Sequence, residues 1–504
     1  MDIQAFLNAT SHTLGVAIAF ISASIVLYVV SISTYNLFFH PLRKFPGPKI
    51  WAVSRIPFAY GQMCGTDVYS ILDLHKRYGP VVRVAPDALS YADEVVYRDA
   101  LAHRHAGQAE FGKSGAFAVV PPNGIPSILL ANRENHARYR RAFAASFSEK
   151  SMQRQQPLIR GYVNSLIKGL HERGSEGAQD LTQWFNWTSF DVIGALTFGE
   201  SFGCLENQKL HPWVKAIFDA AKNIAMTAAI RQVGLGGLIK YLVPKKAQQG
   251  RVLHQKFSED KVRARMALGT DQGDFLDSVL EKNGKDTGMT FDELASTSSL
   301  LVLAGSETTA TLLSGVCYQL CTHPDTLQKA VNEVRSTFES ADEIDLYSSA
   351  RLSYLIACLN ETMRIYPPVP NQPPREAPPG GGVIDGRSIP AKTIIYVSQY
   401  VMNHLETLWA KPEEFHPERF FKNASDVPEE FRNDNHAVFQ PFSVGPRNCI
   451  GKNLAYAEMR MILTRVLFDF DLELDERSKD WTTAQKAYKI WEKPPLWMKI
   501  TPRK

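Results

Sequence analysis

The chain has 504 residues, of which 44% are hydrophobic and 21% charged, an ordinary composition for a protein with a large globular core. A formal net charge of +4 is too small to indicate a nucleic-acid-binding protein, and no basic run with interleaved aromatic residues occurs. The six cysteines lack the paired Cys-x-x-Cys spacing of zinc sites, so the sequence predicts neither a zinc site nor a disulfide framework.

The N-terminal segment is the least polar part of the chain. No Lys, Arg, Asp or Glu occurs from Ile3 to Leu42. The apolar run from Leu14 to Tyr35 would span about 33 Å as a helix, enough for a bilayer core of about 30 Å. A cleaved signal peptide would need positive charge before this run, whereas the first basic residue, Arg43, comes after it. We therefore predict a single transmembrane helix.

The distribution of charge predicts how this helix is oriented. Three basic residues follow the span directly: Arg43, Lys44 and Lys49. The positive-inside rule then makes residues 1–40 a luminal tail and anchor, and residues 41–504 a cytoplasmic domain. Asn8 begins an Asn-Ala-Thr sequon and, being luminal, could carry a glycan.

Proline, glycine and β-branched residues predict the segments that follow the anchor. Phe45-Pro46-Gly47-Pro48 is a stiff hinge. Residues 81–85 and 89–91 read as two short strands on either side of the turn Pro86-Asp87. The glycine- and proline-rich loop over residues 104–128 favours a lid or pocket wall, because it also contains several apolar residues: Phe111, Phe117, Val119 and Val120.

The rest of the chain is mostly helical in pattern. Residues 132–267 predict a series of helices, and within them the apolar stretch 224–242 fits a surface helix or a bilayer interface equally well. A run over residues 290–322 is too long for an average helix and must cross the core. The Ile394–Val397 run predicts a small sheet. We therefore expect one large, mainly α domain with a minor β region.

The long central helix contains Ala-Gly-Ser-Glu-Thr-Thr, beginning at Ala304. Gly305 costs about 1 kcal/mol relative to alanine inside a helix, so a bulky group that approaches the backbone should offset it. Ala304 and Thr308 share one helix face, and Glu307 is adjacent. A helix-packing feature rich in Ser and Thr is an equally good interpretation.

Two weaker patterns follow along the chain. Glu361 and Arg364 lie three residues apart on a predicted helix, as many exposed ion pairs do. Arg419 follows in a proline-bounded Phe-His-Pro-Glu-Arg-Phe loop.

The most informative stretch is Phe442-Ser-Val-Gly-Pro-Arg-Asn-Cys-Ile-Gly451. Cys449 precedes a helix-like run, where the helix dipole favours a thiolate. Gly445 and Gly451 let the backbone pass close to a flat group, and Arg447 offers a cation to a nearby anion. Taken alone, a buried structural cysteine in a Gly/Pro turn would explain the cysteine.

The pattern Phe-x-x-Gly-x-Arg-x-Cys-x-Gly resembles the haem-ligand loop of the cytochrome P-450 family, and every fixed position is present. The other motifs occur in the order of that family, from Pro41 to about Pro495, and the sequence looks like fungal microsomal members of secondary metabolism. The resemblance implies the cytochrome P-450 fold. It also implies haem b, with Cys449 as axial ligand of the iron and Phe442, Gly445 and Gly451 shaping the loop.

The resemblance assigns further roles. Thr308 and Glu307 would be the acid–alcohol pair, with Thr308 hydrogen-bonded to dioxygen, Glu307 supplying protons through water, and Ala304 and Gly305 beside the haem. Arginines would bind the haem propionates: Arg140, Arg375 and Arg447. Histidine replaces the usual tryptophan at His136, which makes His136 a weaker candidate. A buried network would fix the cysteine loop: Glu361, Arg364 and Arg419.

The implied reaction inserts one oxygen atom from O2 into a lipophilic, terpenoid- or polyketide-like molecule. No flavin or nicotinamide motif is visible, so electrons would come from NADPH through a separate cytochrome P-450 reductase, with cytochrome b5 as a second donor. The anchor implies the endoplasmic reticulum membrane. A reductase-independent thiolate-haem isomerase or dehydratase, and a non-catalytic membrane haem or lipid sensor, are the alternatives.

Overall fold

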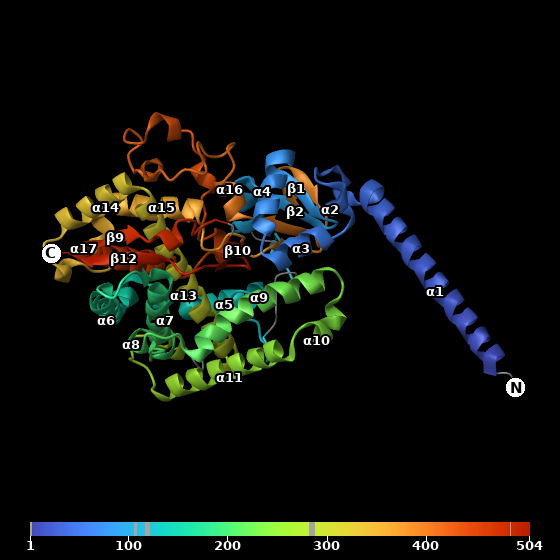
Figure 1. The fold of residues 1–504 in the computed structure, drawn as a ribbon, viewed down its shortest axis with the longest axis horizontal. Coiled ribbons are helices and arrows are strands. Elements are labelled where there is room, and N and C mark those ends of the chain that lie inside the picture. Colours follow the sequence, from blue (N-terminus) through green and yellow to red (C-terminus); the bar gives the residue numbers. More distant parts are fainter. Residues whose placement is uncertain (1–2, 105–107, 116–120, 282–287, 484, 504) are drawn as a thin grey trace.

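The computed structural model describes the chain except for residues 1–2, 105–107, 116–120, 282–287, 484 and 504. Within this part the protein is mainly helical with small sheets, as the sequence predicts (Figure 1). Ten helices form most of the body: α4 (Asp67–Tyr78), α5 (Arg133–Phe143), α6 (Glu149–Gly174), α7 (Leu181–Phe198), α9 (Pro212–Gln232), α11 (Lys245–Ala267), α13 (Phe291–Thr322), α14 (Pro324–Thr337), α15 (Ser353–Ile365) and α17 (Lys452–Asp469). Shorter helices precede them or lie between them: α2 (Lys49–Val53), α3 (Ile56–Cys64), α8 (Cys204–Asn207), α10 (Ile239–Leu242), α12 (Phe275–Leu280) and α16 (Gln399–Asn403). All six cysteines are free thiols.

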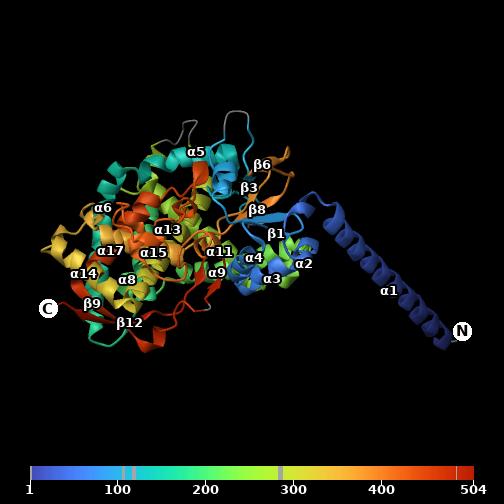
Figure 2. The same cartoon turned by 90° about the horizontal axis from the view of Figure 1, so that it is seen from above.

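The first helix, α1 (Ile3–Thr34), extends away from the body in both views (Figures 1 and 2). The stretch His12–Phe39 has a mean hydropathy of 2.4, and its most apolar part has no buried residue, which makes the stretch a candidate membrane span. The helix begins well before the expected start at Leu14, so the backbone at Asn8 lies within it.

The anchor is fastened to the body at its C-terminal end. It continues as a π-helical turn, Tyr35–Phe39, in which Asn36 is buried. The Asn36 side-chain amide donates to the Val53 carbonyl (3.2 Å), and the buried Arg83 guanidinium donates to the Asn36 carbonyl (2.9 Å). The Arg83 amide also donates to the Pro46 carbonyl in the predicted hinge (2.7 Å). The junction therefore holds the anchor against the first strand.

The strand that receives the anchor belongs to the largest sheet, of order β1-β2-β8-β5-β3. Its strands are β1 (Val81–Ala85), β2 (Ala88–Tyr91), β3 (Gly112–Lys113), β5 (Arg375–Glu376) and β8 (Ile394–Val397). The β1–β2 hairpin and β8 confirm the predicted strands, and β8 runs parallel to β2. In the β3–β5 pair, Lys113 is opposite Arg375, so the predicted long loop contributes a strand next to that arginine. Phe117, Val119 and Val120 of the same loop lie outside the described residues.

The other sheets are small. A three-stranded sheet has the order β4-β12-β9, formed by β4 (Gln179–Asp180), β9 (Phe470–Leu474) and β12 (Trp497–Pro502). Two hairpins complete the β structure of the described chain: β6 (Gly382–Ile384) with β7 (Arg387–Ile389), and β10 (Lys486–Ala487) with β11 (Trp491–Glu492). The three-stranded sheet joins the C-terminus to the start of α7.

The long predicted helix is α13, and it crosses the core (Figure 1). Thr290 and Glu293 form a capping box that satisfies backbone donors at its N-terminus. The helix packs against α7, α11, α15 and α17. It is apolar enough to pass as a membrane span, but 72% of its apolar window is buried, which identifies it as a core helix.

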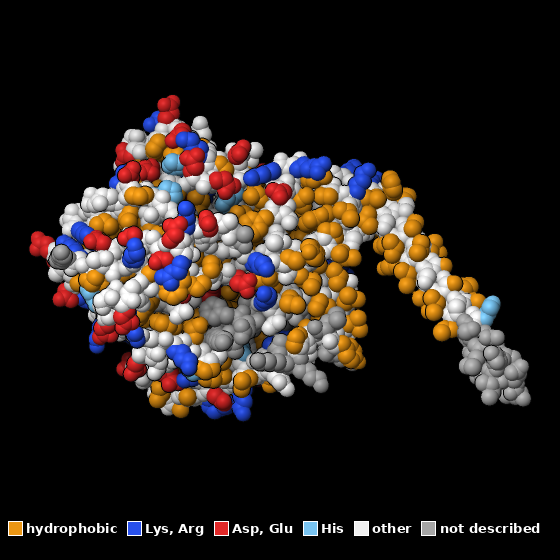
Figure 3. All heavy atoms as spheres, viewed as in Figure 1, with side chains coloured by type: hydrophobic (Ala, Val, Ile, Leu, Met, Phe, Trp, Pro, Cys, Tyr) orange, Lys and Arg blue, Asp and Glu red, His pale blue; other side chains and the backbone are white. Residues whose placement is uncertain are grey.

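An apolar surface lies on the part of the body that carries the anchor (Figure 3). The stretch 224–242 forms the end of α9, a 3-10 turn and α10, with large exposed side chains at Leu235, Leu238 and Tyr241. Helix α3 lies beside α9, joined by a Gln232–Gln62 side-chain hydrogen bond (2.9 Å), and exposes Ile56 and Tyr60. A contiguous apolar surface of this kind is typical of a membrane contact.

Two truncations test the anchor and its junction. Deleting residues 1–34 or residues 1–39 should release most of the protein from membranes in a sedimentation assay, because both remove α1. Only the longer deletion removes Asn36, the acceptor of the buried Arg83 guanidinium. We expect it to lower the free energy of unfolding by a further amount of about 1–3 kcal/mol.

Substituting Leu235 and Tyr241 with serine in the shorter truncation should remove the remaining membrane binding. If the 1–34 deletion that carries both serines still sedimented fully with membranes, the assignment of α1 as the anchor would be contradicted.

Candidate active site

Cys449 lies between a tight turn and the start of α17. The 3-10 turn Gly445–Arg447 precedes it, and its amide donates to the Phe442 carbonyl (2.9 Å). The Ala455 amide donates to the Gly451 carbonyl (2.8 Å), which begins the helix immediately after the cysteine. The Cys449 side chain is exposed, whereas the loop on either side of it is half-buried.

The two glycines of the loop meet different constraints. Gly445 has a φ of +74°, and a Cβ there would lie 2.0 Å from the Leu101 carbonyl oxygen. A Cβ on Gly451 would meet only Phe147 Cε1, at an ordinary contact distance of 3.7 Å. Gly445 is therefore required by the packing of the loop on Leu101, and the described packing leaves room for a small side chain at Gly451.

The Cys449 thiol is exposed, and the protein around it nevertheless desolvates it. Surrounding protein raises the pKa of Cys449 by desolvation, and the Gly451 amide and the Arg140 and Lys452 cations act in the opposite direction. The thiol is thus exposed and yet desolvated. A bound metal ion would deprotonate such a thiol, because the positive charge of the metal stabilises the thiolate.

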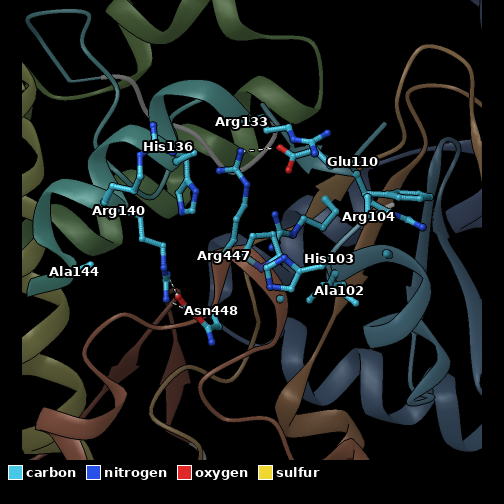
Figure 4. A pocket seen from close by; sticks show the side chains of 18 residues that line it. Ala102, His103, Arg104, Glu110, Arg133, His136, Arg140, Ala144, Arg447 and Asn448 are labelled. Carbon is cyan, nitrogen blue, oxygen red and sulfur yellow. Dashed lines mark hydrogen bonds and ion pairs between the residues drawn. The ribbon is translucent and has the colours of Figure 1, made fainter. Parts of the chain in front are cut away.

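The three predicted propionate-binding arginines line one cavity of about 500 Å³, next to the cysteine loop (Figure 4). Arg140 donates to the Asn448 carbonyl (2.6 Å) and to its side-chain oxygen. Arg447 donates to the Ala131 carbonyl (2.9 Å) and to Glu110 (2.8 Å). Arg375 is buried, and the Nε atoms of Arg375 and Arg447 have no partner among the described residues.

Positive charge exceeds negative charge around this cavity. Its described lining contains one carboxylate, Glu110, and six arginines: Arg104, Arg133, Arg140, Arg141, Arg375 and Arg447. Burial, followed by the nearby cations, lowers the pKa of His136 to about 4, so this histidine is neutral at pH 7. Burial, Arg375 and Arg447 also lower the pKa of Lys113, a group that the sequence analysis missed.

These features fit a haem. Buried guanidinium donors without partners require an anion, and the two carboxylates of a haem would supply it beside Arg375 and Arg447. The cysteine after Asn448 would supply the soft axial ligand that iron accepts from proteins.

One face of α13 is open in the middle of an otherwise buried helix. Ala304 is exposed and Thr308 half-buried, and the Thr308 hydroxyl donates to the Ala304 carbonyl (2.7 Å). A Cβ on Gly305 would lie 2.6 Å from Ile193 Cδ1, so the bulky group that approaches this glycine is a side chain of α7. The open face therefore carries Ala304 and Thr308.

Glu307 points elsewhere. Its carboxylate is buried, pairs with the Lys493 ammonium, and accepts a hydrogen bond from Thr311 (3.4 Å). Sequence adjacency placed Glu307 next to Thr308, but successive residues of a helix point about 100° apart. Lys493 lies far away in the sequence and was not found by the sequence analysis.

Glu361, Arg364 and Arg419 come together in one buried network. Both Glu361 oxygens accept from Arg364 (2.8 and 2.9 Å), and one also accepts from Arg419 Nε (3.1 Å). Arg419 also pairs with Asp434, a fourth member that the sequence analysis missed. All four side chains are almost completely buried, and their formal charges cancel.

Asp434, one member of this network, lies just before the cysteine loop in the sequence. Asp434 accepts from the Ala410 amide (2.7 Å) and leads into a segment whose Val438 carbonyl is held by Tyr97 and Gln399. Gln372 then contacts the loop itself, because its amide donates to the Gln440 carbonyl (3.3 Å) and its carbonyl accepts from Ser443 (2.9 Å). The approach to Cys449 is therefore held by contacts from three distant parts of the chain.

The fold and the cysteine loop define a haem-thiolate enzyme, and comparison with known proteins gives its family. The sequence model of the family described as Cytochrome P450 matches residues 46–498, so the chain belongs to the cytochrome P450 family. It is 42% identical to averantin hydroxylase of Dothistroma septosporum over 100% of this chain and 94% of that protein. It is also 42% identical to trichothecene C-15 hydroxylase of Fusarium sporotrichioides (94% and 96% covered). Versicolorin B desaturase stcL of Emericella nidulans is 41% identical (95% and 97% covered).

The relatives also give the broad activity. Their names are those of hydroxylases, desaturases and monooxygenases of fungal secondary metabolism, which makes this chain an oxidoreductase of the P450 monooxygenase type. The recognition of the family from the cysteine loop is confirmed.

The two loop glycines provide a matched test of the site. Gly445→Ala should abolish haem incorporation, because its Cβ would collide with the Leu101 carbonyl and its φ is positive. Gly451→Ala should retain haem, because the nearest neighbouring atom leaves room for a methyl group. The haem-to-protein ratio of the two purified variants measures the difference. Equal haem contents would contradict the loop geometry.

The network provides a test of stability. Asp434→Asn should lower the free energy of unfolding by about 3–5 kcal/mol, because it leaves buried positive charge uncompensated. Glu430→Gln, at the exposed Lys411 pair in the same segment, should change it by about 0.5 kcal/mol or less. Chemical denaturation of both variants is the measurement, and an effect of Asp434→Asn as small as that of the control would contradict the role of Asp434.

Proposed function

We propose that this enzyme inserts one oxygen atom from O2 into a lipophilic small molecule of fungal secondary metabolism, using electrons from a separate NADPH-dependent reductase. The observation that carries the proposal is the cysteine loop itself: an exposed, desolvated thiol next to a cavity with a large excess of arginines. The open face of α13 supports it, because it offers a hydroxyl group inside the core.

The chain would hold the cofactor by two kinds of contact. Cys449 would bind the haem iron, and Arg140, Arg375 and Arg447 would bind the two propionates. When bound, the haem supplies oxygen activation, which a cysteine thiolate ligand favours by donating electron density. The protein supplies substrate positioning, exclusion of water and delivery of protons.

Thr308 would serve as the hydroxyl of the acid–alcohol pair. The Thr308 hydroxyl donates its hydrogen bond to the Ala304 carbonyl. Its oxygen can therefore accept a hydrogen bond from a donor on the open face of α13. Glu307 would be the acid of the pair and would relay protons through water. Its Oε2 atom is buried and has no partner among the described residues, so this oxygen would take up and release the proton.

Two apolar residues of α13 and the relatives support the substrate class. Leu300 and Leu303 are half-buried near the open face of α13, and apolar neighbours there would suit a terpenoid- or polyketide-like molecule. The similarity to averantin hydroxylase and trichothecene C-15 hydroxylase supports hydroxylation. Desaturation is a second candidate, supported by the similarity to two proteins named versicolorin B desaturase.

The location and the partners complete the proposal. The N-terminal anchor and the basic residues after it support the endoplasmic reticulum membrane, with the catalytic domain in the cytoplasm and Asn8 in the lumen as a glycan acceptor. The redox partners would be the reductase and, as a second donor, cytochrome b5. A reductase-independent isomerase or dehydratase would turn over without NADPH, and a haem or lipid sensor would not consume oxygen in response to substrate.

Thiolate ligation has a direct spectroscopic test. The reduced, CO-bound protein should show the long-wavelength Soret band of a cysteine thiolate ligand. Cys449→Ser should lose this band, and Cys64→Ser, at a free cysteine far from the loop in the sequence, should keep it. Persistence of the band in Cys449→Ser would contradict the assignment of the ligand.

Thr308 has a kinetic test. With reductase, NADPH and a turned-over substrate, Thr308→Ala should release more hydrogen peroxide and less product per NADPH, because the pocket loses a proton-relaying hydroxyl. Thr308→Ser restores the hydroxyl and should recover product formation. Equal product per NADPH in wild type and Thr308→Ala would remove Thr308 from this role, and product without any NADPH would favour the isomerase alternative.

A further inference from the structure

The C-terminal segment brings a buried lysine to the central helix. Lys493 follows β11 directly, and its side chain and that of Glu307 are 3% and 2% exposed. The Lys493 ammonium donates to Glu307 Oε1 and to Thr311 Oγ1 (2.7 Å). Lys493 therefore contacts two residues of α13, Glu307 and Thr311, beside the helix face that carries Thr308.

The position of Lys493 is fixed by the segment around it. The Trp491 indole donates to the Pro367 carbonyl (2.8 Å), and the Trp481 indole donates to the Pro494 carbonyl (2.9 Å). Further along, the Leu496 amide donates to Asp180 (2.9 Å), which ties the segment to the start of α7. The lysine is therefore held by the framework, whereas a surface lysine would be free to move.

The charge of the pair explains why the lysine lies there. Burial raises the pKa of Glu307, and the Lys493 ammonium opposes that rise. Among the described residues, the charge of Glu307 also acts on Tyr366, whose pKa is raised by burial and then by Glu307. Without Lys493, the hydrogen bond from Thr311 alone would oppose the effect of burial, and we expect the carboxyl group to hold its proton.

We propose that Lys493 is a positioning residue for proton delivery: it keeps Glu307 ionised, so that the carboxylate can take up a proton from water and pass it on toward Thr308. This inference rests on the proposed function only in its last step, the transfer of protons to the open face of α13. The first step, the ionisation of Glu307 by Lys493, is a property of the folded protein alone.

The first experiment measures that ionisation without any turnover. Infrared difference spectra of the haem-loaded K493M variant against wild type should show the carbonyl stretching band of a protonated carboxyl group. The band should be absent from the K493M/E307Q double variant and from K493R, which keeps the charge. K499M is the matched control, because Lys499 pairs with Glu473 on the surface of the same C-terminal region.

Absence of the carboxyl band from K493M would overturn the proposal, because Glu307 would then be ionised without its lysine. If K493M does not fold, K493Q takes its place, since an amide can still donate to Glu307 without carrying charge. Haem content and thermal unfolding of every variant separate the loss of a proton relay from the loss of the fold.

The second experiment measures the delivery of protons during turnover. With reductase and a turned-over substrate, K493M should form less product per NADPH by about tenfold or more, with K493R partly restored and K499M unchanged. Product per NADPH equal to that of wild type, together with a lower unfolding temperature, would show that Lys493 only stabilises the fold. Failure of wild type to form product would contradict the proposed function and leave the infrared result standing.

Discussion

The balance of buried charge governs how this protein is built around its cysteine. One group of arginines, Arg364 and Arg419, is neutralised by Glu361 and Asp434 and is closed to solvent. Such a network is rigid, because every displacement would separate charges that are costly to leave unpaired. The other group lines the cavity beside the loop and faces one carboxylate, Glu110. The first group is complete without a ligand, whereas two donors of the second, Arg375 Nε and Arg447 Nε, have no partner among the described residues.

The two groups of arginines therefore have different roles at the site. The neutral network fixes the chain that leads to the loop, through Asp434 and the segment that Tyr97 and Gln399 hold. The close approach of Gly445 to Leu101 fixes the loop itself. The exposed thiol and the cavity with the unpartnered arginine donors then adjoin the same loop, where a haem, with its two carboxylates and its iron, would satisfy both. A flexible loop could not present ligand and cations at a constant separation.

The sequence predicted the parts of this arrangement that are local and missed those that come from distant segments. The cysteine loop, the β1–β2 hairpin and α13 follow from short-range patterns, and the structure has them. Asp434, Lys113 and Lys493 carry no local signal, since each becomes meaningful only when another part of the chain folds against it. Gly305 shows the same limit: the sequence required a close neighbour, and only the packing of α7 on α13 shows that the neighbour is Ile193.

The sheets explain how these distant segments are joined. The largest sheet contacts the end of the N-terminal helix at β1, through Arg83 and Asn36, and carries Arg375 on β5, its fourth strand. The junction with the N-terminal helix and the arginine-lined cavity therefore share one sheet, and strand pairing fixes the orientation of the cavity relative to that junction. The three-stranded sheet does the same for the C-terminus: it ties β12 to the start of α7, and so brings Lys493 against α13. Because α7 also packs on α13 at Gly305, the helix that carries Thr308 is held on two sides by elements that meet at this sheet.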